Sequence, residues 1–350
     1  MYLHCGWRCR ANSLFLRIVE SVINDMIMNM DGKVIARIVA VVAAVLVLLS
    51  FVAGWFMCNY ALKPKYHGQD VEMTGKTIDE RYPGVISQWY EPLHEGGVFK
   101  DTVITGERGY RLHAVYAPAA HPESAAGTAV IIHGYTNNHL SFANLSRMYR
   151  DSLNYNILVP DLHYHGMSEG RAIQMAWLDR LDVLRWIDVA HNIWQDDFML
   201  VTGVSMGGAT TMMVSGESLP SYVGAFIEDC GYSSVWEQFA HNLKQQFHLP
   251  PFPVLHCADI ICRLRYGWSF KEASSLDQLA SCGRPMLFIH GDADDYVPTS
   301  MVYDNYDAKT SGYKELWIAR GSAHADAWKD HPEEYQRVVS SFLDKVRSQR

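Results

Sequence analysis

The chain of 350 residues lacks the features of several large protein classes. It has no basic tract, and its 38 Asp and Glu outnumber its 30 Lys and Arg, so we expect no nucleic-acid partner. It has no C-x-x-C pair, no dinucleotide fingerprint and no P-loop, so we expect no cofactor. Hydrophobic residues make up 49% of the chain, which is enough to build a large core and excludes wholesale disorder.

Cysteine is also scarce, with seven residues and no paired metal-ligand spacing. Cys257 and Cys262 are close enough in sequence to form a disulfide if this part of the chain faces an oxidising compartment. Alternatively, both residues are buried free thiols. The sequence leaves both open.

Charge is absent from one long stretch. Ile38 to Leu62 is an uncharged run of 25 residues, which as a helix is roughly 37 Å long and exceeds the ~30 Å hydrocarbon core of a bilayer. Trp55 and Tyr60 near its end suit an interfacial aromatic belt. A buried core helix is the alternative, but such helices are usually shorter and amphipathic. We therefore predict a transmembrane helix over 38–62, with the lipid bilayer as its partner.

The segment before this helix is read as an N-terminal tail, residues 1–37. No A-x-A cleavage site follows the apolar run, which favours a retained signal anchor over a cleaved signal peptide. Basic residues flank both ends, so orientation rests on the short tail before one anchor, which favours an extracytoplasmic domain. Met26, Met28 and Met30 offer alternative starts, so 1–29 can belong to an over-long gene start.

The rest of the chain divides into a polar segment and a large domain. Residues 63–98 are predicted to be a stalk that becomes a docking segment near Val85, Ile86, Trp89 and Leu93. From 99 to 350, apolar strand-like runs alternate with helical patterns, which predicts an α/β domain with a mostly parallel sheet covered on both faces. The expected strands are Thr102–Thr105, Arg111–Tyr116, Thr128–Ile132, Ile157–Val159, Phe198–Thr202, Val223–Ile227, Met286–Ile289 and Leu316–Ile318. The expected helices are Ser141–Ser152, Ala176–Ile193, Gly207–Val214 and Glu333–Val346.

One segment interrupts the alternation. Residues 231–276 contain many aromatic side chains and a Pro-rich run between two core strands. Such an insertion is typical of a lid over a pocket, although extra packing helices without a gating role would give the same pattern.

A nucleophile motif follows the fifth predicted strand. Gly203-Val204-Ser205-Met206-Gly207 is a G-x-S-x-G pattern directly between a strand and a helix, as a nucleophile elbow requires. Gly203 and Gly207 are small because the tight turn brings backbones together. Ser205 is therefore the predicted nucleophile, and a plain glycine-rich turn is the alternative.

A serine hydroxyl needs a base, and the base needs an acid to orient it. His324 follows the last predicted strand and is the predicted base. Asp294 follows the strand Met286–Ile289 and is the preferred acid. Its rivals are Asp292, Asp295 and Asp229.

The oxyanion of an acyl-transfer intermediate needs two donors. We expect the backbone N–H of Met206, at the start of a helix, and that of Tyr135, in the loop after the strand Thr128–Ile132. Tyr135 as a mere pocket wall is the alternative.

These motifs, in the order Ser205, Asp294, His324, resemble the α/β-hydrolase superfamily over about 250 residues. The chain is similar to its bacterial membrane-anchored, carboxylesterase-like or serine-aminopeptidase-like branch. The His290-Gly291-x-x-Asp294-x-x-Val297-Pro298 pattern resembles that family's acid loop. Asp161-Leu162-His163-Tyr164-His165-Gly166 resembles its Asp-x-Arg-Gly-x-Gly turn but carries His163 and Tyr164 where Arg and Gly are usual. His163 and His165 without a third ligand make a weak metal signal, so no metal is expected.

The resemblance implies a serine hydrolase that acts through an acyl-enzyme. An esterase with a small-molecule ester or acyl substrate is the first expectation, because a simple site of this fold cleaves activated carbonyls. A peptidase or amidase, or a thioesterase, is the alternative within the fold. A binding protein that keeps the fold without the chemistry is the alternative of a different class.

Overall fold

A computed structural model describes residues 31–349. Residues 1–30 of the predicted 1–37 tail, including the alternative starts, therefore lie outside the described residues, whereas residues 32–37 belong to the first helix of the structure. The chain divides into two compact units, one ending at Ala53 and one beginning at Gly54. Helix α2 (Gly32–Leu62) begins in the first unit, and its last nine residues belong to the second. Among the described residues, α2 alone is long and apolar enough to cross a membrane.

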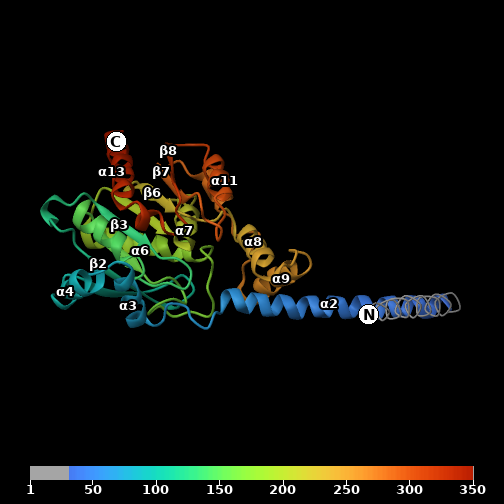
Figure 1. The fold of residues 1–350 in the computed structure, drawn as a ribbon. Helices are drawn as coiled ribbons and strands as arrows, with labels where there is room; N and C mark the ends of the chain where they lie inside the picture. Colours follow the sequence, from blue (N-terminus) through green and yellow to red (C-terminus); the bar gives the residue numbers. More distant parts are fainter. Residues whose placement is uncertain (1–30, 350) are drawn as a thin grey trace, which may run out of the picture. The chain divides into compact units, whose positions relative to one another are not determined.

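The second unit is built on an eight-stranded mixed sheet (Figure 1). Its order is β1-β2-β4-β3-β5-β6-β7-β8, with β1 and β2 antiparallel to their neighbours and the other strands parallel. The strands are β1 (Lys100–Thr105), β2 (Arg111–Ala117), β3 (Thr128–Ile132), β4 (Asn156–Pro160), β5 (Met199–Val204), β6 (Val223–Asp229), β7 (Met286–Gly291) and β8 (Lys314–Ala319). All eight strands were predicted, which confirms the α/β architecture.

Helices cover both faces of this sheet (Figure 1). One face packs on α6 (Asp179–Trp194), α7 (Met206–Ser215) and α11 (Ser300–Ala308). The other packs on α5 (Ala143–Arg147), the π-helical turns η1 (Val85–Tyr90) and η3 (Met148–Ser152), and α13 (Pro332–Ser348). The remaining short helices are η2 (Pro122–Ser124), α4 (Glu91–Glu95), α10 (Ser275–Ser281) and α12 (Ala327–Asp330).

The central strands are buried on both faces, because helices cover the sheet on each side and alternate side chains of a strand enter the two cores. In β3, Val130 and Ile132 join the core under α6 and α7, while Ala129 and Ile131 join the core under α5 and α13. This is why the parallel strands read as continuous apolar runs in the sequence. The sheet thereby holds the carboxyl ends of β3, β5, β6 and β7 at one edge.

Two helix starts differ from the prediction. The helix expected from Ala176 begins at Asp179, because Met175 and Ala176 adopt positive φ angles of 48° and 72° that a right-handed helix excludes. The helix expected over Ser141–Ser152 begins at Ala143 and changes to a π-helical turn after Arg147.

The segment predicted as a stalk is packed on the domain. Helix α3 (Val71–Arg81) buries Thr74 and Gly75, and the side-chain amide of Asn138 donates to the carbonyl of Gly68 and to the hydroxyl of Thr74, both at 2.9 Å. Val85, Ile86 and Trp89 are buried as the docking residues were expected to be. The sequence predicted a stalk here because the segment is held partly by polar contacts, which produce no apolar periodicity in the sequence.

The aromatic insertion forms two helices, α8 (Val235–Phe247) and α9 (Val254–Tyr266). Cys257 and Cys262 both lie on α9, and both are free thiols. Five residues apart on a helix, their side chains point to different sides, so the disulfide alternative is not realised.

Candidate active site

Ser205 lies at the turn between β5 and α7. Its backbone adopts φ 60° and ψ −118°, an unusual conformation for a residue with a side chain. The turn is held by its N–H, which donates to the carbonyl of Asp229 at 2.7 Å. A Cβ on Gly203 would collide with the backbone of Gly207, and one on Gly207 would collide with the carbonyl of Ile132. The two glycines of the motif are therefore required by close backbone approach.

The structure brings the predicted base and acid to this turn. The Nε2 atom of His324 lies 2.8 Å from Ser205 Oγ, and its Nδ1 atom lies 2.7 Å from Asp294 Oδ2. With Nδ1–H donating to the carboxylate, Nε2 is left to accept the hydrogen bond from the Ser205 hydroxyl. The geometry matches that of a serine nucleophile with its base and orienting acid.

The carboxylate of Asp294 is kept charged by its surroundings. Burial acts to raise the pKa of Asp294, but hydrogen bonds from His290 and His324 outweigh it and hold the pKa well below its usual range. The N–H groups of Tyr296 and Val297 also donate to Asp294 Oδ1, at 3.0 and 2.9 Å. A charged acid at this position favours the protonated imidazole that forms when His324 takes a proton.

The rival acids lie elsewhere. Asp292 accepts a hydrogen bond from the Gly321 N–H at 2.6 Å, and Asp295 is exposed. Asp229 lies at the end of β6, where burial raises its pKa to about 6. Only Asp294, of the four candidates, contacts His324 by a hydrogen bond that the described residues contain.

Two backbone N–H groups, those of Met206 and Tyr135, lie on elements next to the nucleophile. Met206 is the first residue of α7, and Tyr135 is the third residue after β3. Neither N–H has a hydrogen-bond acceptor within residues 31–349. The loop containing Tyr135 lies against the nucleophile, since a Cβ on Gly134 would be 3.4 Å from Ser205 Cβ. Both groups can thus serve as donors to an oxyanion.

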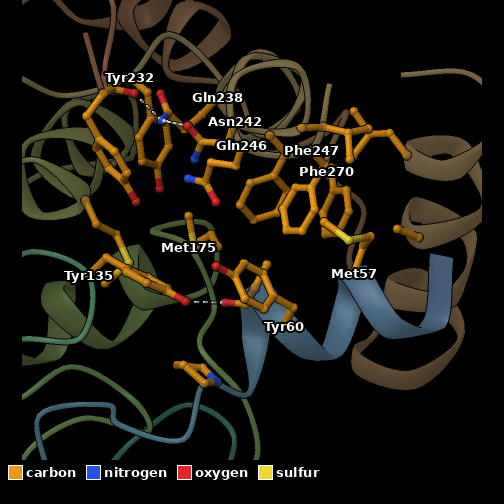
Figure 2. Close-up of a pocket in the computed structure, with 18 of the residues that line it drawn as sticks. Met57, Tyr60, Tyr135, Met175, Tyr232, Gln238, Asn242, Gln246, Phe247 and Phe270 are labelled. Atoms are coloured by element: carbon orange, nitrogen blue, oxygen red, sulfur yellow. Dashed lines mark hydrogen bonds between the residues drawn. The ribbon is translucent and has the colours of Figure 1, made fainter. Parts of the chain in front are cut away.

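Ser205 is one of the residues that line a cavity of roughly 470 Å³. Figure 2 shows this cavity in close-up. Tyr135, Met175 and Met206 line it near the nucleophile. From α8, Gln238, Asn242 and Gln246 present a stripe of carboxamides, four residues apart, on one side. The opposite end is apolar and is lined by Met57, Phe239, Phe247, Val254, Leu255 and Phe270.

The sequence was compared with known protein families and with curated proteins. No protein-family profile matches the chain. The uncharacterized protein YqkD of Bacillus subtilis is 29% identical over 245 residues, which cover 70% of this chain and 79% of YqkD.

Solved structures of the same fold include the esterase Pf2001 of Pyrococcus furiosus, with a TM-score of 0.58 and 20% identity over 72% of this chain and 95% of that one. Est1E of Butyrivibrio proteoclasticus, solved with ferulic acid, matches with a TM-score of 0.58 and 18% identity over 71% and 99% of the two chains. The chain is an α/β-hydrolase by fold. A puromycin-hydrolysing peptidase of Mycobacterium tuberculosis also matches, with a TM-score of 0.55 and 17% identity, over 71% of this chain but 39% of that one.

One turn departs from the pattern of α/β-hydrolases, and the structure shows what replaces it. Asp161 accepts hydrogen bonds from the ring Nδ1 atoms of His113 and His139, at 2.8 and 3.0 Å, and from the His139 and Met167 N–H groups. The second ring nitrogen of His113 lies 2.8 Å from Asp101. Desolvation acts to lower the pKa of His113, but these two carboxylates outweigh it and raise the pKa. The two carboxylates therefore favour the protonated form of His113 beside Asp161.

His163 and His165, singled out in the sequence, do not join this cluster. His165 is fully buried, and its Nε2 accepts a hydrogen bond from the N–H of Thr136 at 3.2 Å, next to Tyr135. Burial lowers the pKa of His165 well below its usual value, so it is neutral. This hydrogen bond ties His165 to the loop that carries Tyr135. No sequence signal marked His113 and His139, because they meet Asp161 from separate parts of the chain.

Proposed function

We propose that the chain is a membrane-anchored serine hydrolase that cleaves carboxylic esters through an acyl-enzyme. The observation that carries the proposal is the arrangement of Ser205, His324 and Asp294 at hydrogen-bond distance at the turn between β5 and α7. Esterases among the solved structures of the same fold support it.

The reaction follows from these positions. His324 Nε2 takes the proton of the Ser205 hydroxyl as Oγ attacks the ester carbonyl. The N–H groups of Tyr135 and Met206 stabilise the negative oxygen of the tetrahedral intermediate. His324 returns the proton to the leaving alcohol as the ester C–O bond breaks, which leaves an acyl group on Ser205. Water then attacks the acyl-enzyme, with His324 again as the base, and releases the carboxylic acid.

The cavity favours esters over peptides. An aminopeptidase needs a carboxylate to bind the substrate's amino terminus, and no Asp or Glu occurs among the described residues that line the cavity. Lys63 and Lys65 are its charged lining residues. The puromycin-hydrolysing peptidase keeps amide cleavage as the second candidate, and thioester cleavage remains an alternative of the same mechanism.

We test the chemistry on the full chain in detergent with a fluorophosphonate probe and a p-nitrophenyl ester series. Wild type should be labelled and should hydrolyse the esters, while Ser205→Ala and His324→Ala should lose labelling. Ser124→Ala, at an exposed serine, is the matched control. Absence of labelling in folded wild type would contradict the hydrolase proposal and favour a binding protein that keeps the fold.

We also propose that α2 anchors the protein with the hydrolase domain outside the cytoplasm. The length and apolar composition of α2 support the anchor. Protease added to intact cells should degrade the domain if this orientation holds. Protection in intact cells and digestion only after lysis would reverse the orientation.

A further inference from the structure

The last turns of α2 are part of the hydrolase domain itself. Cys58 and Leu62 are fully buried. The Leu62 carbonyl accepts a hydrogen bond from the Ile173 N–H at 2.9 Å, and the Ala61 carbonyl accepts one from the Tyr135 hydroxyl at 2.8 Å. Tyr135 is also a candidate oxyanion residue. The end of the apolar helix is therefore joined directly to the loop beside the nucleophile.

The same turns line the cavity (Figure 2). Met57, Tyr60 and Ala61 form one wall, and the ring of Tyr60 lies edge-on to Phe247 of α8, with ring centroids 5.6 Å apart. Exposed lining residues mark the mouth, and they lie on α2, on α8 and just after α2: Tyr60, Lys63, Lys65 and Gln246. The entrance is therefore built from the residues where the apolar helix ends.

The length of the apolar run determines how deep in a bilayer the Met57–Ala61 wall of the cavity would lie. A hydrocarbon core of about 30 Å takes roughly 20 helical residues. Counted from Ile38, the first residue after the charged Arg37, that length ends near Met57. The cavity wall from Met57 to Ala61 then lies at the boundary between acyl chains and head groups.

The surface around this wall is apolar. Of the fourteen large apolar side chains exposed between Gly54 and Gln349, seven lie on the end of α2 or on the α8–α9 segment. They are Trp55, Phe56, Tyr60, Leu249, Phe252, Ile260 and Leu264. Phe252 and Leu264 are 71% and 81% exposed, and the basic residues Lys244 and Arg263 lie among them. Apolar side chains mixed with basic ones are typical of a surface that rests in a membrane interface.

We propose that this surface rests in the bilayer and that the site takes its substrate from the same leaflet, as the aliphatic acyl ester of a membrane amphiphile. The inference rests on the proposed esterase function. The acyl chain would occupy the apolar end of the cavity between Met57 and Phe270, with its ester at Ser205 and its polar part near the carboxamides of α8. Continuity with α2 identifies the bilayer as the occupant of the exposed surface.

The test uses the full chain reconstituted in vesicles of ether-linked phosphatidylcholine and phosphatidylglycerol, which contain no ester to compete. Two substrates are compared: 4-methylumbelliferyl oleate carried in the vesicles and water-soluble p-nitrophenyl acetate. The variant is Phe252→Asp with Leu264→Asp, at two exposed positions where folding is not at risk. Tyr303→Asp on α11 is the control, an exposed aromatic residue away from the cavity.

The proposal predicts that the double variant loses about tenfold or more on the vesicle-borne oleate, since withdrawing one apolar side chain from the interface forfeits at least that much. Acetate hydrolysis and fluorophosphonate labelling should stay within about twofold of wild type, because neither needs the interface. The control should match wild type on both substrates.

Equal oleate hydrolysis by wild type and double variant would overturn the inference. So would a wild type that hydrolyses acetate but not vesicle-borne oleate, and the proposed esterase function would then stand alone. A folded wild type that is neither labelled nor active on either ester would overturn the proposed function, and with it the inference.

Discussion

Gly54 is the position where α2 comes closest to α9, and its replacement by Ala tests how the two helices are joined. A Cβ at Gly54 would lie 2.7 Å from Cys257 Cβ, 2.8 Å from the backbone nitrogen of Ala258 and 2.9 Å from the backbone carbon of Cys257. Two of these three atoms belong to the backbone and cannot rotate away. The helices must therefore separate by about 0.7 Å to restore ordinary contact near 3.5 Å.

Two opposing effects determine how much Gly54→Ala changes the free energy of unfolding. Gly→Ala inside a helix is favourable by roughly 1 kcal/mol. Overpacking of this kind costs about 1–3 kcal/mol, and a gap of 0.5–1 Å forfeits a quarter to a half of the neighbouring dispersion energy. Gly32→Ala provides the matched control, because it lies on the same helix and its added Cβ has no heavy atom within 4 Å. The control carries the helix-propensity effect alone.

Thermal unfolding of the full chain in detergent measures the difference between the two variants. We expect Gly54→Ala to be less stable than Gly32→Ala by about 1–3 kcal/mol, since the overpacking cost separates them. Hydrolysis of long-chain esters should fall with it, because Met57 and Tyr60 on the adjacent turn line the cavity. Unfolding temperatures that coincide for the two variants would refute the close packing of α2 on α9.

Three further changes test the site and its surroundings. Asp294→Asn should lower kcat for p-nitrophenyl esters by about 10³–10⁴ without unfolding the domain, because His324 loses the partner that fixes its tautomer; an unchanged rate would assign the acid role elsewhere. Gly203→Ala should destabilise the domain by about 1–3 kcal/mol and abolish fluorophosphonate labelling, whereas Gly283→Ala, which has open space, should do neither. Burial and the nearby Asp182 raise the pKa of Asp179 from 3.8 to about 8, so the native state keeps a proton that the unfolded chain loses, and stability falls as pH rises from about 4 to 8. Asp179→Asn should remove the contribution of Asp179 and so make the fall smaller than in wild type, where Glu228 also has a raised pKa, which unfolding temperatures at pH 5 and pH 8 would reveal.

The sequence predicted the sheet because buried parallel strands have a strong signature. The central parallel strands coincide with apolar runs, and Ser205, Asp294 and His324 each lie within five residues after the end of a strand. Residues at the carboxyl ends of adjacent parallel strands must meet at one edge, so the positions of three distant side chains could be inferred together. The G-x-S-x-G turn was recognisable because close backbone approach leaves no room for a Cβ at Gly203 or Gly207.

The buried histidine cluster was not predictable in the same way. His113 lies 48 residues from Asp161 and His139 lies 22 residues from it, and neither has a motif of its own. Their encounter depends on β2 pairing with β4, and on the path of the loop after β3. Polar contacts between distant segments carry no periodicity, so pattern analysis could not locate them.

The sequence alone did not show where along α2 the second unit begins, for a related reason. An apolar helix face looks the same in sequence whether it meets lipid or protein. Cys58 and Leu62 lie within the predicted transmembrane helix 38–62, yet they are fully buried in the unit that begins at Gly54. Hydropathy could therefore detect the helix but could not show that its last turns are packed on protein.

The shared use of α2 couples two properties that could otherwise evolve separately. Under the proposed anchoring, a residue between Gly54 and Leu62 must satisfy both the membrane boundary and the shape of the cavity wall. A change of bilayer thickness, or the exchange of this helix for another anchor, would then alter which acyl chains fit at Met57 and Tyr60. A fragment that begins at Lys63 would also leave the groove that Cys58 and Leu62 fill exposed to water. Soluble versions of the protein should therefore keep the chain from Gly54 onward.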